Sequence, residues 1–91
     1  MERAEFEAAL SRDGYRIVAR DMPPNTVNPD HTHEFDARVL VTAGVFTMTI
    51  AGVRRVLNPG DWCDVPAGLV HAEACGPDGV SLVAGRRAPA A

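Results

Sequence analysis

Short apolar runs alternate with turn residues along most of this 91-residue chain. From Tyr15 onward, seven such runs are separated by Gly, Pro, Asn and Asp: YRIVARDM, ARVLVTA, VFTMTIA, VRRVL, DWCDV, LVHAEA and VSLVAG. Short β-rich runs at a spacing of about eight to twelve residues are typical of antiparallel sandwiches and barrels. No helix of crossover length separates them, which argues against an α/β fold. The pattern predicts an all-β domain.

The first residues of the chain follow a helical pattern instead. Phe6, Ala9 and Leu10 recur at helical spacing, acidic residues come first, and Arg12 closes the segment. Gly14 follows at a position where helices commonly stop. We therefore expect one short helix before the first strand.

Length and composition indicate a single small domain. Hydrophobic residues make up 46% of the chain and charged residues 23%, as in ordinary globular proteins. We divide it into a helix within residues 1–14 that packs on a barrel, the barrel itself over 15–87, and a frayed tail over 88–91. A chain of this size buries only about 60 to 65% of its unfolded surface. We therefore expect a homodimer, in which a second copy adds to a thin core.

The charge pattern excludes several classes of function. The net charge is −3, and the longest basic runs are the pairs Arg54-Arg55 and Arg86-Arg87, which argues against nucleic acid as a partner. All nine basic residues are arginine, so chemistry that needs a lysine Schiff base or lysine base is excluded.

The sequence also predicts a compartment. The N-terminus has no apolar stretch of signal-peptide length, and no segment reaches the ~20 apolar residues of a membrane span. We expect a cytoplasmic protein without membrane contact, in which Cys63 and Cys75 stay reduced. A disulfide between them would require strands that bring them within bridging distance.

Three histidines are the candidate metal ligands. His31 and His33 are two residues apart, and residues at this spacing on a strand point to the same face. His71 would add a third imidazole from another strand. Neutral imidazole binds Zn, Fe, Ni and Cu, and three of them leave coordination positions for water or substrate. The alternative for the HxH pair is two solvated side chains in a loop after Pro29-Asp30.

Two segments resemble the motifs of the cupin superfamily. GDWCDVPAGLVH, residues 60–71, resembles the second cupin motif, with Gly, Pro, Gly and His at the expected spacing. HTHEFDARVLVTAG, residues 31–44, resembles the first motif in its HxH and its final Gly. The resemblance covers about Val27 to Val83. It implies a small single-domain cupin: a double-stranded β-helix, or jelly-roll barrel, with both motifs at one end.

The chain departs from the cupin pattern at the fourth ligand. The usual Glu is missing, because its expected place is Ala37 or Arg38. Glu73 shares a strand face with the histidine of the second motif by the two-residue period, and we prefer it narrowly. Asp36 is the alternative, and Glu34 lies near enough at the strand entrance to swing in.

Three further side chains are candidates for the pocket. The Asn that often follows the second motif is replaced by Cys75, which shares the predicted face of Glu73 and otherwise acts as a buried apolar residue. Trp62 belongs to the core or a dimer interface, or contacts a ligand at the mouth. Arg38 binds a ligand carboxylate or pairs with a neighbouring acid, and we favour the structural role.

The resemblance leaves the reaction open, because one fold hosts many functions. The first hypothesis is a protein that holds a divalent transition metal (Zn, Fe, Ni or Mn) through three histidines and binds a small molecule in the barrel mouth, as an oxygenase or isomerase. The second is a non-catalytic protein, with or without a metal, that binds or senses a small ligand as a dimer. Loss of the usual Glu favours the second hypothesis, whereas retention of all three histidines favours the first.

Overall fold

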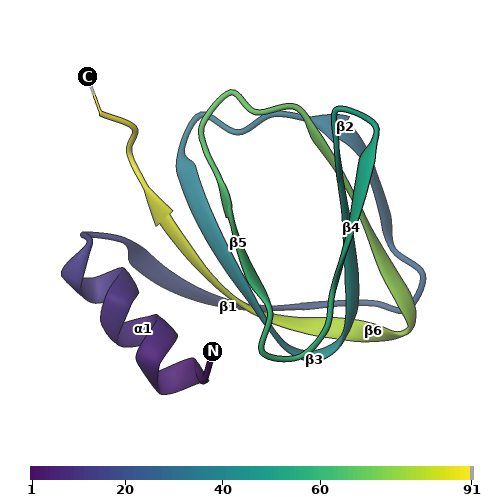
Figure 1. The fold of residues 1–91 in the computed structure, drawn as a ribbon, viewed down its shortest axis with the longest axis horizontal. Helices are drawn as coiled ribbons and strands as arrows, with labels where there is room; N and C mark the ends of the chain where they lie inside the picture. The colour runs from purple at the N-terminus through teal and green to yellow at the C-terminus, as the bar shows by residue number, and fades with distance from the viewer. Residues whose placement is uncertain (91) are drawn as a thin grey trace.

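The computed structural model describes residues 1–90, which form one short helix and six antiparallel strands (Figure 1). The elements are α1 (Arg3–Arg12), β1 (Arg16–Met22), β2 (Val27–His31), β3 (Asp36–Ile50), β4 (Val53–Leu57), β5 (Trp62–Val65) and β6 (His71–Arg87). The mostly β structure with one short N-terminal helix confirms the predicted fold class.

Two long bent strands, β3 and β6, hold the barrel together. They pair with each other along most of their length. The first half of β3 and the second half of β6 form one layer with β5 and β1 at its edges. The other halves form a second layer with β4 and β2 at its edges. The two layers face each other in Figure 1, which is the jelly-roll arrangement.

The sequence pattern predicts turns within β3 and β6 that are not present in the structure. Gly44 and the segment 76–79 are predicted as turns, but they lie inside continuous strands where the β3–β6 register shifts. Gly44 has a φ of 80°, and a Cβ there would lie 2.1 Å from the carbonyl oxygen of Gly79. The strands therefore bend at these glycines without separating. The sequence pattern also missed β2, because Pro29 and Asp30 are turn signals in most contexts.

Along each strand, successive side chains point alternately into the barrel and out from its surface. The larger core cluster lies between the layers and includes Val41, Phe46, Met48 and Leu57. A second cluster lies outside the first layer, where Phe6 and Leu10 of α1 pack on β3 and β6. Each of these helix side chains is almost completely buried, and burial of one is worth about 1.5 to 3 kcal/mol. The helix therefore covers one outer face of the barrel.

The two cysteines are buried free thiols in the barrel core. The Sγ of Cys63 lies 3.9 Å from the Sδ of Met48. Burial raises the pKa of Cys63 to about 11, and burial also raises the pKa of Cys75. Both residues therefore act as small core side chains.

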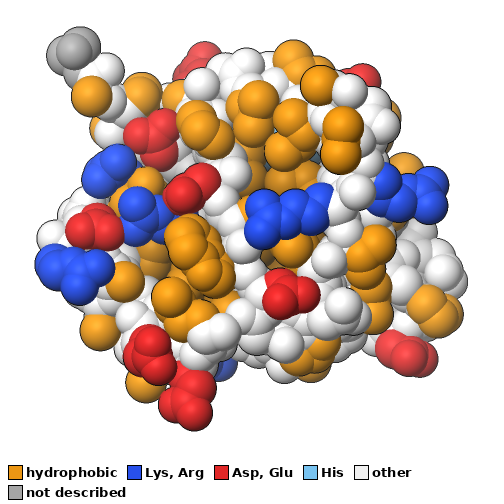
Figure 2. All heavy atoms as spheres, viewed as in Figure 1, with side chains coloured by type: hydrophobic (Ala, Val, Ile, Leu, Met, Phe, Trp, Pro, Cys, Tyr) orange, Lys and Arg blue, Asp and Glu red, His pale blue; other side chains and the backbone are white. Residues whose placement is uncertain are grey.

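The strands β4 and β5 run along one side of the barrel, where they are edges of different layers and do not pair with each other (Figures 1 and 2). Hydrophobic side chains gather on this side in Figure 2, and a basic side chain crosses them. Arg55 of β4 donates a hydrogen bond of 3.2 Å to the Trp62 carbonyl oxygen on β5, which links the two edges.

Among the described residues, no helix is long and apolar enough to cross a membrane.

Candidate metal centre

The three histidines of the chain meet at one end of the barrel. His31 ends β2, His33 follows in the loop to β3, and His71 begins β6 directly opposite His31 in the β2–β6 pairing. One ring nitrogen from each lies within 4.8 Å of the other two. His71 is 1% exposed, and the other two are half-buried. The structure thus brings together the three residues that the sequence proposed as ligands.

Backbone carbonyls orient two of the three rings. The Nδ1 of His31 lies 2.7 Å from the carbonyl oxygen of Pro29, and the Nδ1 of His71 lies 2.9 Å from that of Leu69. A carbonyl oxygen only accepts, so each Nδ1 carries the proton and donates it. The lone pair of each neutral ring is therefore on Nε2, the tautomer that a metal ligand needs.

A glycine corner joins the two histidine segments. The backbone N–H of Gly68 donates a 2.9 Å hydrogen bond to the carbonyl oxygen of His33. Gly68 has a φ of 80°, a conformation that glycine adopts without a steric penalty. This corner lies just before β6 and therefore fixes the start of the strand that carries His71.

Asp36, the alternative fourth ligand, holds the same corner instead of facing the histidines. Its Oδ1 accepts a 2.9 Å hydrogen bond from the backbone N–H of Ala67, and its Oδ2 lies 3.6 Å from the guanidinium of Arg87. Both carboxylate oxygens are therefore engaged in the loop and the C-terminal strand. Glu34 is exposed and lines a surface hollow together with Phe35 and Arg86.

Glu73 is the carboxylate that faces the histidines. Its Oε1 lies 3.4 Å from the Nε2 of His31 and accepts a hydrogen bond of 3.3 Å from the side-chain amide of Asn28. Because the proton of neutral His31 is on Nδ1, two electron-rich atoms face each other here. A cation between them, either a proton or a metal ion, makes this contact favourable. The structure thus places Glu73 beside the candidate ligands, on the strand face that the two-residue period predicts.

His33 is held by an aromatic contact. Its ring stacks on Phe35 with centroids 4.7 Å apart. Its pKa is lowered, first by burial and then by the charges that His71 and His31 would carry. At neutral pH this imidazole is therefore in the unprotonated form that binds metal.

The donor set fits a divalent transition metal. With metal–nitrogen bonds of about 2.0 to 2.1 Å, tetrahedral nitrogens are separated by about 3.4 Å. The nitrogens of the three histidines lie within 4.8 Å of one another, so modest side-chain rotations would bring them to that spacing. Three imidazoles and one carboxylate are typical ligands of Zn, Fe, Ni and Mn.

Two of the predicted pocket residues lie elsewhere. Arg38 hydrogen-bonds Asp13 and Asp64 at 2.6 and 2.7 Å and lies over the ring of Tyr15. Trp62 packs beside Phe6 of the helix, with ring centroids 6.2 Å apart. Both side chains face α1 from the outside of the barrel, so the structure does not bring them together with the histidines. Arg38 has the structural role that we favoured.

The third, Cys75, faces the barrel core. It pairs with Phe46 across β6 and β3, on the inward face that Glu73 shares. At 8% exposure it belongs to the packed interior.

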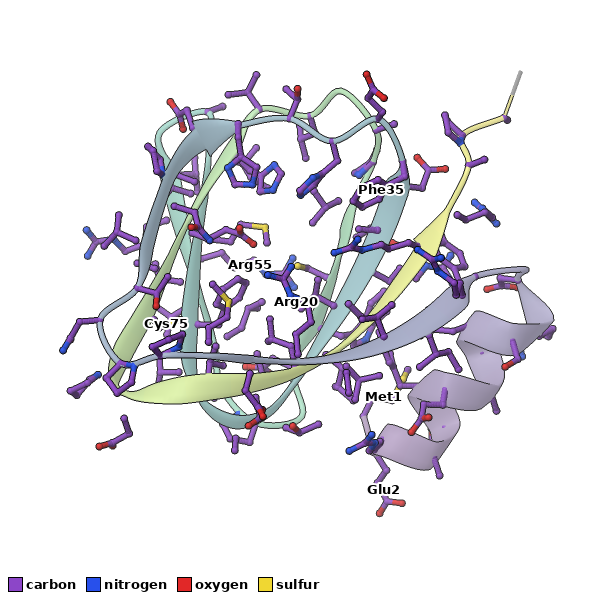
Figure 3. The ribbon with its side chains drawn as sticks, turned by 180° about the vertical axis from the view of Figure 1, so that it is seen from behind. Met1, Glu2, Arg20, Phe35, Arg55 and Cys75 are labelled. Carbon is purple, nitrogen blue, oxygen red and sulfur yellow. The ribbon has the colours of Figure 1, made fainter. Side chains whose placement is uncertain are left out.

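A small hollow beside the histidines contains residues that the sequence analysis missed. It has a volume of about 50 Å³, and its walls are His33, Glu73, Phe35, Arg20, Arg86 and apolar side chains of β1, β3 and β6. Figure 3 shows Arg20 extending from β1 over the barrel interior. The alternation of β1 is the signal that could have identified it, because Arg20 shares a strand face with buried Met22.

The chain belongs to the cupin family. A family model described as "Cupin domain" (Cupin_2) matches residues 19–82, which is more than half of the chain. This match confirms the family that the two motifs indicated. None of the curated proteins matches the chain.

Several solved structures share the fold. An RmlC-like cupin from Shewanella frigidimarina is 28% identical, with a TM-score of 0.70 over 84% of this chain and 67% of that one. KdgF from Halomonas sp. is 26% identical, with a TM-score of 0.67 over 79% of this chain and 67% of that one. A protein of unknown function from Rhizobium leguminosarum is 17% identical, with a TM-score of 0.77 over 86% and 73% of the two chains, and shows the fold alone.

Proposed function

We propose that this chain is a metal-binding cupin that holds one divalent transition metal through His31, His33 and His71 and binds a small molecule in the barrel mouth. The observation that carries the proposal is the convergence of the three ring nitrogens within 4.8 Å. Two of the rings are oriented by backbone carbonyls, which is the outer support that metal-ligating histidines usually have.

Glu73 completes the proposed ligand set. Its carboxylate lies beside the Nε2 of His31, and Asn28 holds it there through a side-chain hydrogen bond. A metal held by three histidines and one carboxylate keeps open positions, at which it supplies Lewis-acid or redox chemistry to a bound molecule. An oxygenase or isomerase reaction is consistent with such a site, and we propose these two classes as the first to assay.

The second hypothesis, in its metal-free form, is a protein that binds or senses a small ligand as a dimer. The absence of a ligating side chain at Ala37, where cupins usually have Glu, favours it. Retention of all three histidines argues against it, because their ring nitrogens converge within 4.8 Å and would then hold nothing. Measuring the metal content discriminates between the two hypotheses.

Elemental analysis of freshly purified protein tests the proposal. We expect about one transition-metal ion per chain after Zn²⁺, Ni²⁺, Fe²⁺ or Mn²⁺ is offered and excess is removed. His31→Ala/His33→Ala should lose the ion, whereas the exposed control Glu34→Gln should keep it. A metal content near zero in the unmodified protein for every ion offered would reject the metal site and favour the metal-free protein.

We also propose that two copies associate and that the protein works in the cytoplasm. Edge strands β2 and β4 expose Val27 at 69%, Val53 at 69% and Val56 at 51%, and strand edges can pair with another chain. Sedimentation analysis tests the dimer: Val56→Lys should weaken association if this edge forms the contact. The buried free thiols are consistent with a reducing compartment.

A further inference from the structure

Two arginines beside the histidines have no acidic partner. Arg20 of β1 and Arg86 of β6 line the same hollow as His33 and Glu73. Within residues 1–90, neither guanidinium forms an ion pair or a hydrogen bond. Of the other arginines, Arg3, Arg12, Arg38 and Arg87 each contact a carboxylate, whereas Arg16, Arg54 and Arg55 form no ion pair among the described residues. What distinguishes Arg20 and Arg86 from those three is that both line one hollow with His33 and Glu73, where two guanidinium groups would receive an anion together.

Arg86 is held in place before any ligand arrives. Its guanidinium lies 4.8 Å from the centre of the Phe35 ring, and His33 stacks on the same ring with centroids 4.7 Å apart. The cross-strand neighbour of Arg86 on β3 is Ala37, which faces the hollow and carries no charge. Arg86 is therefore fixed by its contact with the ring, next to the metal centre, with its hydrogen-bond donors available.

We propose that Arg20 and Arg86 receive the carboxylate of a small organic acid whose other polar end faces the three histidines. This inference rests on the proposed function, since it names the class of small molecule that the barrel mouth binds.

The chemistry of the hollow favours a monocarboxylate over a phosphate. Two arginines against the one charge of Glu73 leave a net charge of about +1 on the side chains, to which a bound divalent metal would add, so the small volume and apolar walls of the hollow, rather than its charge, favour a carboxylate. A guanidinium binds a carboxylate through two parallel hydrogen bonds. The remaining walls include Met22, Val39 and Leu82, which suit an apolar body. The hollow, at about 50 Å³, has room for a few atoms, so a longer molecule would extend toward solvent.

Calorimetric titration with glycolate tests the inference, with ethylene glycol as the uncharged probe of similar shape. The titrations use the full chain, both metal-free and loaded with Co²⁺, whose absorption spectrum reports metal binding independently. We expect glycolate to bind at least about tenfold more tightly than ethylene glycol or inorganic phosphate. Arg20→Gln and Arg86→Gln should each weaken glycolate binding about tenfold or more, because each removes a charge-assisted contact.

Two further variants sharpen the test. Ala37→Glu places a carboxylate beside Arg86 and should also weaken glycolate binding. Arg54→Gln is the matched control, because Arg54 has no ion pair among the described residues but lines a hollow on the outer face of the second layer. Its glycolate affinity should stay within about twofold of the unmodified protein.

The outcomes separate this inference from the proposed function. Equal glycolate binding by Arg20→Gln, Arg86→Gln and the unmodified protein would overturn the arginine subsite even when cobalt binds normally. Tighter binding of phosphate would also overturn it, in favour of a phosphorylated ligand. If cobalt does not bind, the proposed metal site fails, and the metal-free titrations decide the inference: arginine-dependent glycolate binding supports it, and none overturns it.

Discussion

Replacing Glu73 by Gln and His71 by Ala should weaken metal binding to different degrees, with His71 the more costly. A structural zinc site gains about 10 to 16 kcal/mol from four ligands, or about 3 kcal/mol per ligand, which corresponds to more than 100-fold in affinity. His71 is fully buried and its ring is fixed by the Leu69 carbonyl, so no other side chain of the site takes its place. Gln at position 73 keeps an oxygen at the same place but loses the negative charge, so we expect the metal affinity to fall about tenfold.

Competition with a chromogenic chelator measures both affinities. Glu34→Gln, an exposed acid outside the site, controls for the loss of one negative charge, and His33→Ala provides a ligand variant at a half-buried position that disturbs the fold less. A larger loss with Glu73→Gln than with either histidine variant would refute the ligand set. No loss with Glu73→Gln would leave the three histidines as ligands and remove Glu73 from the set.

Three further measurements test the core and the site. Burial and the neighbouring histidines lower the pKa of His33, so on acidification the unfolded chain protonates this residue at a higher pH than the folded chain does. The melting temperature of the metal-free protein should therefore fall as the pH drops below about 6.5. A melting temperature that is unchanged between pH 7 and pH 5 would contradict this. Gly85→Ala would place a Cβ 2.5 Å from a methyl group of Leu10 in α1, so the free energy of unfolding measured in urea should fall by about 1 to 3 kcal/mol. Gly76→Ala, whose Cβ would make only ordinary contacts, should change it less. Buried Cys63 and Cys75 should react with a thiol reagent only on unfolding, and rapid labelling of the native protein would show that the barrel opens.

The short helix and most of the strands were predictable because their signals are local. Alternation of apolar and polar residues, together with glycine, proline and asparagine at the turns, marks these elements without knowledge of the fold. The strand β2 was not predictable in this way. Its sequence, VNPDH, contains three residues that disfavour strands, and its pairing with β6 is what keeps it extended. Long-range pairing of this kind leaves no local signal in one sequence.

The candidate ligands were predictable because their spacing reflects the strand period and because two motifs occur in order. The parity argument also placed Glu73 on the inward face of β6, where the structure has it. The surroundings of Arg38 and Trp62 were not predictable in this way. Each lies on the outward face of its strand, and only the position of α1 over that face explains their surroundings.

The departure from the cupin pattern at Ala37 changes the electrostatics of the site as well as its ligand count. Ala37 is the inward-facing cross-strand neighbour of Arg86, so a glutamate there would lie beside that guanidinium and compensate its charge. With alanine, the hollow keeps both its space and an uncompensated cation, while Glu73 supplies a carboxylate to the histidines from the opposite layer. The absence of a carboxylate at position 37 therefore leaves Arg86 free for the carboxylate of the proposed ligand, while Glu73 remains the proposed fourth ligand of the metal.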